Sequence, residues 1–121
     1  MTVRRLAGEL VDPTWRDADR PLVQFVMDWR RYPEQRDAVL AGPPSPGTSE
    51  LVSAKIAAVV HALCERDGVA VPRWVHRCRL DPAVALFGVP LNSGFGDFVR
   101  ARSPRVCVTH GVFFGADLLD A

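Results

Sequence analysis

The fold is decided by residues 51–74, LVSAKIAAVVHALCERDGVAVPRW. Their first half is a long apolar run with helical character, and either Thr48 or Ser49, which precede it, is expected to cap the helix. Gly68 suits the left-handed backbone that ends many helices, and Pro72 then allows a short second helix through Arg77. We therefore expect a central buried helix followed by a tight corner, and this stretch carries no catalytic signature.

A further helix is predicted over residues 20–32. Its apolar side chains recur at the spacing i, i+3, i+4 and i+7, which places them on one face: Leu22, Phe25, Val26 and Trp29. Shorter helices are expected over residues 2–10 and from Pro33 to about residue 41. Together with the central helix, these elements predict a helical domain.

The remaining segments are shorter or less regular. Residues 42–47, GPPSPG, cannot form regular structure and are read as a connector within one domain. A last amphipathic helix is expected around residues 95–99, and an extended piece over Val106 to Val108. The predicted fold class is mainly α: a single small domain over residues 1–121 with five to seven short helices and a minor extended segment near the C-terminus.

Composition narrows the class of protein. The chain has 121 residues, 48% of them hydrophobic, and a net charge of +1, which fits one globular domain with no general attraction to nucleic acid or membranes. The longest apolar helical run, residues 56–64, is too short to span a bilayer. The three cysteines are widely spaced, and no apolar segment follows Arg4 and Arg5, so we expect a cytoplasmic protein without a signal peptide or disulfides.

Three segments resemble a family of uncharacterised actinobacterial proteins. They are residues 23–44 (VQFVMDWRRYPEQRDAVLAGPP), residues 51–74, and residues 103–119 (SPRVCVTHGVFFGADLL). Some members of this family are similar to the C-terminal part of helix-turn-helix regulators, and others to small antitoxin-like proteins. The resemblance implies a small helical protein that acts on another protein, such as a cognate toxin or a regulator.

Metal binding is an alternative suggested by the cysteines and histidines. All six fall into three close pairs: His61 with Cys64, His76 with Cys78, and Cys107 with His110. Zinc prefers these ligand types, so a zinc-binding helical protein is one reading. Small buried cysteines in apolar segments explain the same pattern more simply, and we assign no metal site and no cofactor.

Enzyme motifs are missing from the sequence. It contains no Gly-x-Ser-x-Gly elbow, and Gly94-Phe95-Gly96 is not followed by the Lys-Ser/Thr of a phosphate-binding loop. Cys78 lies between Arg77 and Arg79, but a lone cysteine between arginines is weak support for a nucleophile. We therefore predict a protein that is not an enzyme.

Nucleic-acid binding is a second alternative. Residues 73–79 (RWVHRCR) interleave basic, aromatic and titratable side chains, and Arg100, Arg102 and Arg105 form another basic group. On one shared face they would contact phosphates. No recognition helix is apparent, so a DNA-associated regulator is not the favoured function.

Protein–protein interaction accounts best for the many aromatic residues near glycines. Interface centres are enriched in aromatic and arginine side chains. We predict that Trp74, Phe113 and Phe114 are apolar contact residues and that Arg77 and Arg79 form a charged rim around them. The predicted function is a non-enzymatic module, antitoxin-like or accessory to a regulator, that covers a surface of a partner protein.

Overall fold

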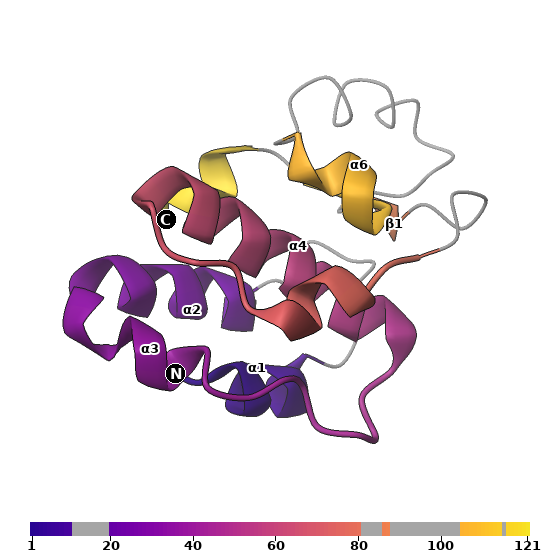
Figure 1. The fold of residues 1–121 in the computed structure, drawn as a ribbon, viewed down its shortest axis with the longest axis horizontal. Helices are drawn as coiled ribbons and strands as arrows, with labels where there is room; N and C mark the ends of the chain where they lie inside the picture. The colour runs from indigo at the N-terminus through magenta and orange to yellow at the C-terminus, as the bar shows by residue number, and fades with distance from the viewer. Residues whose placement is uncertain (11–19, 81–85, 88–104, 115) are drawn as a thin grey trace.

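Helix α4, Glu50–Asp67, is the central element of the fold (Figure 1). Its N-terminus is capped by Ser49, whose hydroxyl oxygen accepts a hydrogen bond from the Val52 N–H at 3.2 Å. Gly68 follows with a φ of 69°, and its N–H donates to the Cys64 carbonyl. Both ends lie where the sequence predicts them, because a capping hydroxyl and a left-handed glycine fix them.

The computed structural model describes residues 1–10, 20–80, 86–87, 105–114 and 116–121. Besides α4, its α-helices, 3₁₀ helices (η) and strands are α1 (Val3–Glu9), α2 (Arg20–Arg31), η2 (Pro33–Gln35), α3 (Arg36–Val39), η3 (Arg73–Arg77), β1 (Leu86–Phe87), α6 (Val106–His110), β2 (Val112–Phe113) and η5 (Ala116–Asp120). The two short strands pair in parallel, with Leu86 opposite Val112. The mainly α fold is therefore confirmed.

Helix α4 is buried on nearly all sides. Every residue from Val52 to Cys64 is buried except Ser53, because α1, η3, η5, α6 and β2 all contact this helix. A helix that is apolar around its whole circumference is expected to be enclosed in this way. The chain's one lysine, Lys55, and His61 are also buried on it.

The predicted stripe of α2 is confirmed. Leu22, Phe25, Val26 and Trp29 are all buried, whereas Arg30 and Arg31 at the end of the helix are exposed. In Figure 1, α1 and α2 lie on one side of α4 and α6 lies on the other. The core therefore surrounds α4 and includes α1, α2 and α6.

The segment Val106 to Val108 was expected to be extended, and that prediction is wrong. It begins α6, which ends at Gly111 with a φ of 68°. Its β-branched valines favour strands locally, but a helix buries Val106, Cys107 and His110 together, and α6 packs on α4. The extended residues come later, in β2.

The helix predicted around residues 95–99 lies outside the described residues. Residues 42–47 contain no helix or strand, as their prolines predict. In the part of the chain that is described, no helix has the length and apolar character needed to cross a membrane.

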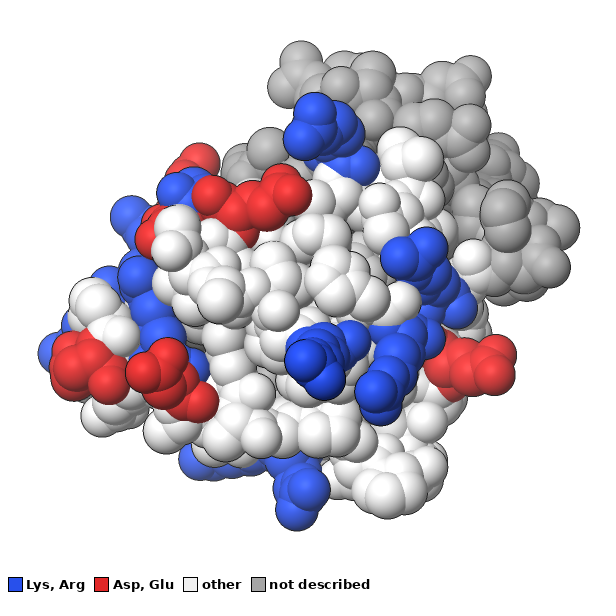
Figure 2. All heavy atoms as spheres, in the orientation of Figure 1, with Lys and Arg blue, Asp and Glu red and all other residues white. Residues whose placement is uncertain are grey.

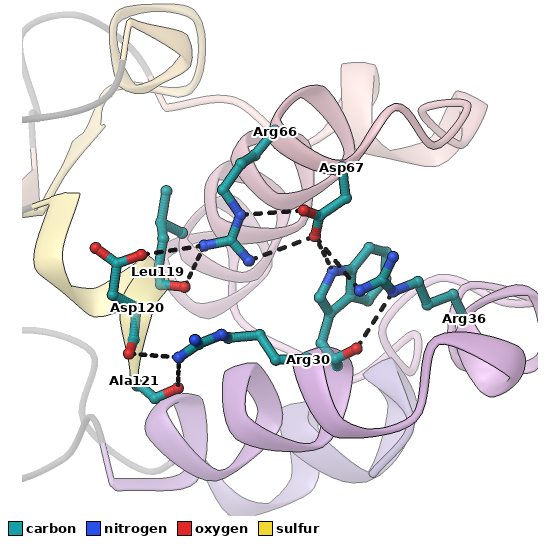
Figure 3. A network of polar contacts seen from close by, with 8 residues as sticks. Arg30, Arg36, Arg66, Asp67, Leu119, Asp120 and Ala121 are labelled. Atoms are coloured by element: carbon teal, nitrogen blue, oxygen red, sulfur yellow. Dashed lines mark hydrogen bonds and ion pairs between the residues drawn. The ribbon is translucent and has the colours of Figure 1, made fainter.

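Asp67, the last residue of α4, connects α4 to α2 and α3 through a polar network (Figure 3). The Trp29 indole Nε1 donates to its carboxylate at 2.7 Å, and Arg36 Nη2 lies 3.6 Å from the same oxygen. The Arg36 guanidinium also stacks 4.8 Å above the Trp29 ring. Arg66 donates to both oxygens of the carboxylate, at 3.2 and 3.3 Å.

The network continues to the C-terminal residues. Arg66 Nη1 donates to the Leu119 carbonyl, and Arg30 Nη1 donates to oxygens of Asp120 and Ala121 at 2.5 and 2.6 Å (Figure 3). Arg30 and Arg66 therefore hold η5 against α2 and α4.

Candidate functional site

The five predicted interface residues occupy different environments. Arg77, in η3, and Arg79 are exposed, and Trp74 is half-buried. Phe114 is only 3% exposed and belongs to the core, so it presents no surface to a partner in this structure. Phe113 lies in β2, and its side chain is outside the described part of the molecule. A surface site therefore retains Trp74 and the two arginines.

Trp74 lies at the edge of the core in η3. Its ring packs against buried residues, but its Nε1 is buried without a hydrogen-bond partner among the described residues. A buried N–H that makes no hydrogen bond costs about 1–3 kcal/mol, so an acceptor for Trp74 Nε1 is worth this much to the described part of the molecule. Trp74 therefore combines a half-buried ring with an indole N–H that has no acceptor among the described residues.

Exposed arginines lie close to Trp74 in the sequence of η3 and the residues after it. Arg73, Arg77 and Arg79 are exposed, and we call them the arginine face. Figure 2 shows basic side chains gathered over the part of the surface where η3 lies, and these are arginines because the one lysine is buried. Arg79 is held by a hydrogen bond from its Nε to the His76 carbonyl at 2.9 Å. Arg73 and Arg77 make no hydrogen bond or ion pair within the described residues.

The basic group predicted near residues 100–105 is only partly described. Arg105 is exposed next to α6, whereas Arg100 and Arg102 lie outside the described residues.

The three histidines of the chain lie together, with His61 and His110 buried and His76 exposed. His61 Nδ1 lies 2.9 Å from His110 Nε2, and His110 Nδ1 lies 2.7 Å from the Cys78 carbonyl oxygen. The exposed His76 ring is 5.4 Å from the His61 ring, edge to face. Spacing alone did not predict this cluster, because its members come from α4, η3 and α6.

The Cys78 carbonyl fixes the proton positions in the cluster. A carbonyl oxygen only accepts, so His110 Nδ1 carries a hydrogen and, in the neutral ring, His110 Nε2 is an acceptor. His61 Nδ1 must then donate to His110, which leaves His61 Nε2 as an acceptor facing Glu65 Oε1 at 3.6 Å. The chain of hydrogen bonds is complete with both buried histidines neutral.

The surroundings favour the neutral forms. Burial is the main cause that lowers the pKa of His61; His76 and Arg79 lower it further, and Glu65 opposes them. Burial also lowers the pKa of His110, the Cys78 carbonyl raises it, and the neighbouring basic groups lower it again. Both histidines therefore resist protonation more than an exposed histidine does.

The cluster does not assemble the zinc ligands suggested by the sequence. His61, His76 and His110 come together, but Cys78 contributes its backbone carbonyl to the histidine chain. Cys64 and Cys107 are buried. Within the described residues, no three His, Cys, Asp or Glu side chains are arranged to hold a metal ion. The residues that meet are the three histidines and not the predicted His/Cys pairs, and His61 Nδ1 and His110 Nε2 are engaged with each other.

The predictions from the sequence did not include a second exposed area, which is apolar and lies on α2. Met27 is 48% exposed and Val23 36% exposed, one turn apart on the outer face of α2. A shallow depression beside them is lined by Gln24, Met27, Asp28, Arg30, Arg31 and Ala121. The i, i+4 spacing of Val23 and Met27 was the available signal, but it lies outside the dominant apolar stripe of α2.

We found no match to this chain among protein-family models, curated proteins or solved structures. The resemblance to regulator-associated and antitoxin-like proteins therefore remains a prediction from the sequence.

Proposed function

We propose that the chain is a non-enzymatic interaction module, antitoxin-like or accessory to a regulator, that binds an acidic surface of a partner protein. The observation that carries the proposal is the arginine face around Trp74, whose indole N–H has no described partner. Exposed guanidinium groups bind carboxylates through paired hydrogen bonds. A partner that supplies carboxylates to the arginines and an acceptor to Trp74 would satisfy both features.

A protein partner fits these features better than nucleic acid. The chain has 15 basic and 14 acidic residues, so it lacks the strong positive field that nucleic-acid binding exploits. Half-buried tryptophan beside arginine is typical of the residues that dominate protein interfaces. Binding would require the Trp74 side chain to turn outward from the core edge.

Capture of the partner is the first experiment. Tagged full-length protein is recovered from its native host at moderate salt, with nuclease present, and the metal content of the eluate is measured. A stoichiometric acidic protein that survives nuclease supports the proposal. Loss of the captured material on nuclease treatment replaces it with the DNA-associated alternative. A stoichiometric zinc ion, with a melt that chelator shifts, would instead support the zinc-binding alternative.

Variants then locate the surface. The double variant Arg73→Ala, Arg77→Ala removes two side chains that have no described hydrogen bond or ion pair, so its stability should be unchanged. We expect affinity for the captured partner to fall at least about tenfold. The control Arg31→Ala removes another exposed arginine, from α2, and should change affinity less than about twofold. Equal effects of the two changes would place the binding surface elsewhere.

A further inference from the structure

We propose that the His61–His110 pair is a pH-dependent switch that holds α6 against α4 when neutral and releases α6 when both rings bind a proton. The proposal rests on the hydrogen-bond geometry of the pair and stands independently of any partner. It concerns the side chains that join the two helices at their contact.

His110 links α6 to two other parts of the fold through hydrogen bonds, in addition to the packing of Val106 and Cys107. Its ring donates to the Cys78 carbonyl and accepts from His61, and its own carbonyl accepts from the Leu80 N–H at 3.0 Å. The side chain is completely buried. Loss of the ring contacts would therefore weaken the attachment of α6 to both α4 and the segment after η3.

The first added proton leaves this arrangement intact. It enters at His61 Nε2, which is the free acceptor of the pair and faces the exposed Glu65 carboxylate. His61 Nδ1 still donates to His110 Nε2 in that state. A negative Glu65 stabilises the singly protonated pair.

The second proton cannot be accommodated. The remaining acceptor is His110 Nε2, and a hydrogen there would face the hydrogen on His61 Nδ1 across the 2.9 Å contact. Two charged rings would also lie with their centroids 5.2 Å apart. The rings must separate, and their separation breaks the link between α4 and α6.

The other charged groups around the pair oppose protonation, with one exception. Among the described residues, Glu65 of α4 favours it, whereas His76 of η3 and Arg79 after η3 disfavour it. Because the pKa of each ring is lowered in the closed state, the open state binds more protons below the usual histidine value of 6.5. Acidification therefore favours opening, by up to about 100-fold in the opening constant per pH unit while the closed pair is neutral, and by up to about tenfold once the closed pair holds the first proton.

The test is hydrogen exchange of the full chain between pH 7.5 and 4.5, corrected for the intrinsic pH dependence of exchange. Amides of α6, such as Gly111 N–H bonded to the Cys107 carbonyl, should lose protection on acidification, while central amides of α4 keep theirs. Equal loss in α4 would mean global unfolding and would overturn the proposal. So would α6 protection that does not depend on pH.

A matched variant separates the switch from general acid sensitivity. His61→Asn keeps an N–H donor near the Nδ1 position but cannot be protonated, so the pH dependence should fall to at most about tenfold per pH unit. His76→Asn removes the exposed neighbour and should retain the steep dependence of the native chain. Nitrogen-15 spectra must also place the His110 proton on Nδ1 at pH 7.5. A proton on Nε2, or an unchanged slope in His61→Asn, contradicts the mechanism.

Discussion

Replacing Asp67 with asparagine is the most direct test of the network that joins α2, α3 and α4. The carboxylate accepts from Trp29 Nε1 and lies against the guanidinium groups of Arg36 and Arg66. Asparagine keeps the shape of the side chain and one accepting oxygen for Trp29. The change therefore removes the negative charge with little effect on packing.

The loss of free energy can be worked from these contacts. The Trp29 hydrogen bond, at 2.7 Å, should lose about 1 kcal/mol when its acceptor becomes neutral. The two arginine pairs together contribute about 1.5 kcal/mol, since Arg36 is mostly buried and Arg66 is partly exposed. Removing a negative charge from the last turn of α4 stabilises the helix by about 0.5 kcal/mol. The expected net loss is about 2 kcal/mol.

Urea denaturation followed by circular dichroism measures this loss of free energy. In thermal denaturation, the melting temperature should fall by roughly 6–10 °C. The matched control is Asp37→Asn. Asp37 is exposed on α3 and has no hydrogen bond or ion pair within the described residues, so its replacement should change stability by less than about 0.5 kcal/mol.

The pH dependence supplies a second check. Burial by itself would raise the pKa of Asp67, but hydrogen bonds from Arg66 and Trp29 and the charges of Arg66 and Arg36 outweigh it and lower the pKa below 3.8. Its contribution is therefore present above that pH and lost as the pH falls through the lowered value. The difference between the native chain and Asp67→Asn should shrink in acid. A variant as stable as the native chain at pH 7, or a difference unchanged down to pH 2, would refute the reasoning.

Three further predictions concern the glycines, the cap and a cysteine. Gly68→Ala should lower the free energy of unfolding by about 1–2 kcal/mol, because the φ of 69° is strained for alanine. No atom lies within 4 Å of the added methyl group, so no clash adds to this loss. Gly111→Ala should cost more in the same denaturation assay, because its methyl group would also lie 3.2 Å from Leu80. Ser49→Ala should lower stability by about 1 kcal/mol through loss of the α4 cap, and Ser49→Asp should restore it. The Cys64 thiol, whose pKa burial raises to about 11, should react with iodoacetamide at pH 8 only as fast as the chain unfolds.

Each of these outcomes has a clear contrary result. Equal losses of stability for the two glycine variants would mean that Leu80 moves away from the added methyl group without a measurable loss of free energy. If Ser49→Ala is as stable as the native chain, packing against other elements, and not the cap, determines where α4 begins. Labelling of Cys64 at the rate of a free thiol would show that its part of α4 opens locally.

The elements that the sequence predicted well are those set by neighbouring residues. Ser49 and Gly68 set the two ends of α4 through hydrogen bonds with residues three or four positions away. The stripe of α2 follows from helical period alone. Such short-range signals do not depend on what else packs nearby, so they can be read without the fold.

The missed features depend on contacts between distant segments. His61 and His110 are 49 residues apart, and nothing in either local sequence says that their rings meet. The helical state of residues 106–110 likewise depends on packing against α4, which outweighs the strand preference of its valines. Phe114 shows the same limit, because an aromatic residue beside a glycine has the same local sequence whether it is buried or exposed.

The arginines show why composition alone could not identify the candidate surface. Arg30 and Arg66 bind η5, and Arg36 binds Trp29 and Asp67, so these side chains serve the fold. Arg73 and Arg77 have no such partners among the described residues and are exposed beside Trp74. Arginines of the first kind should affect stability when replaced, and those of the second kind should affect only binding. A count of arginines mixes the two classes, whereas their contacts separate them and direct the search for a partner to η3.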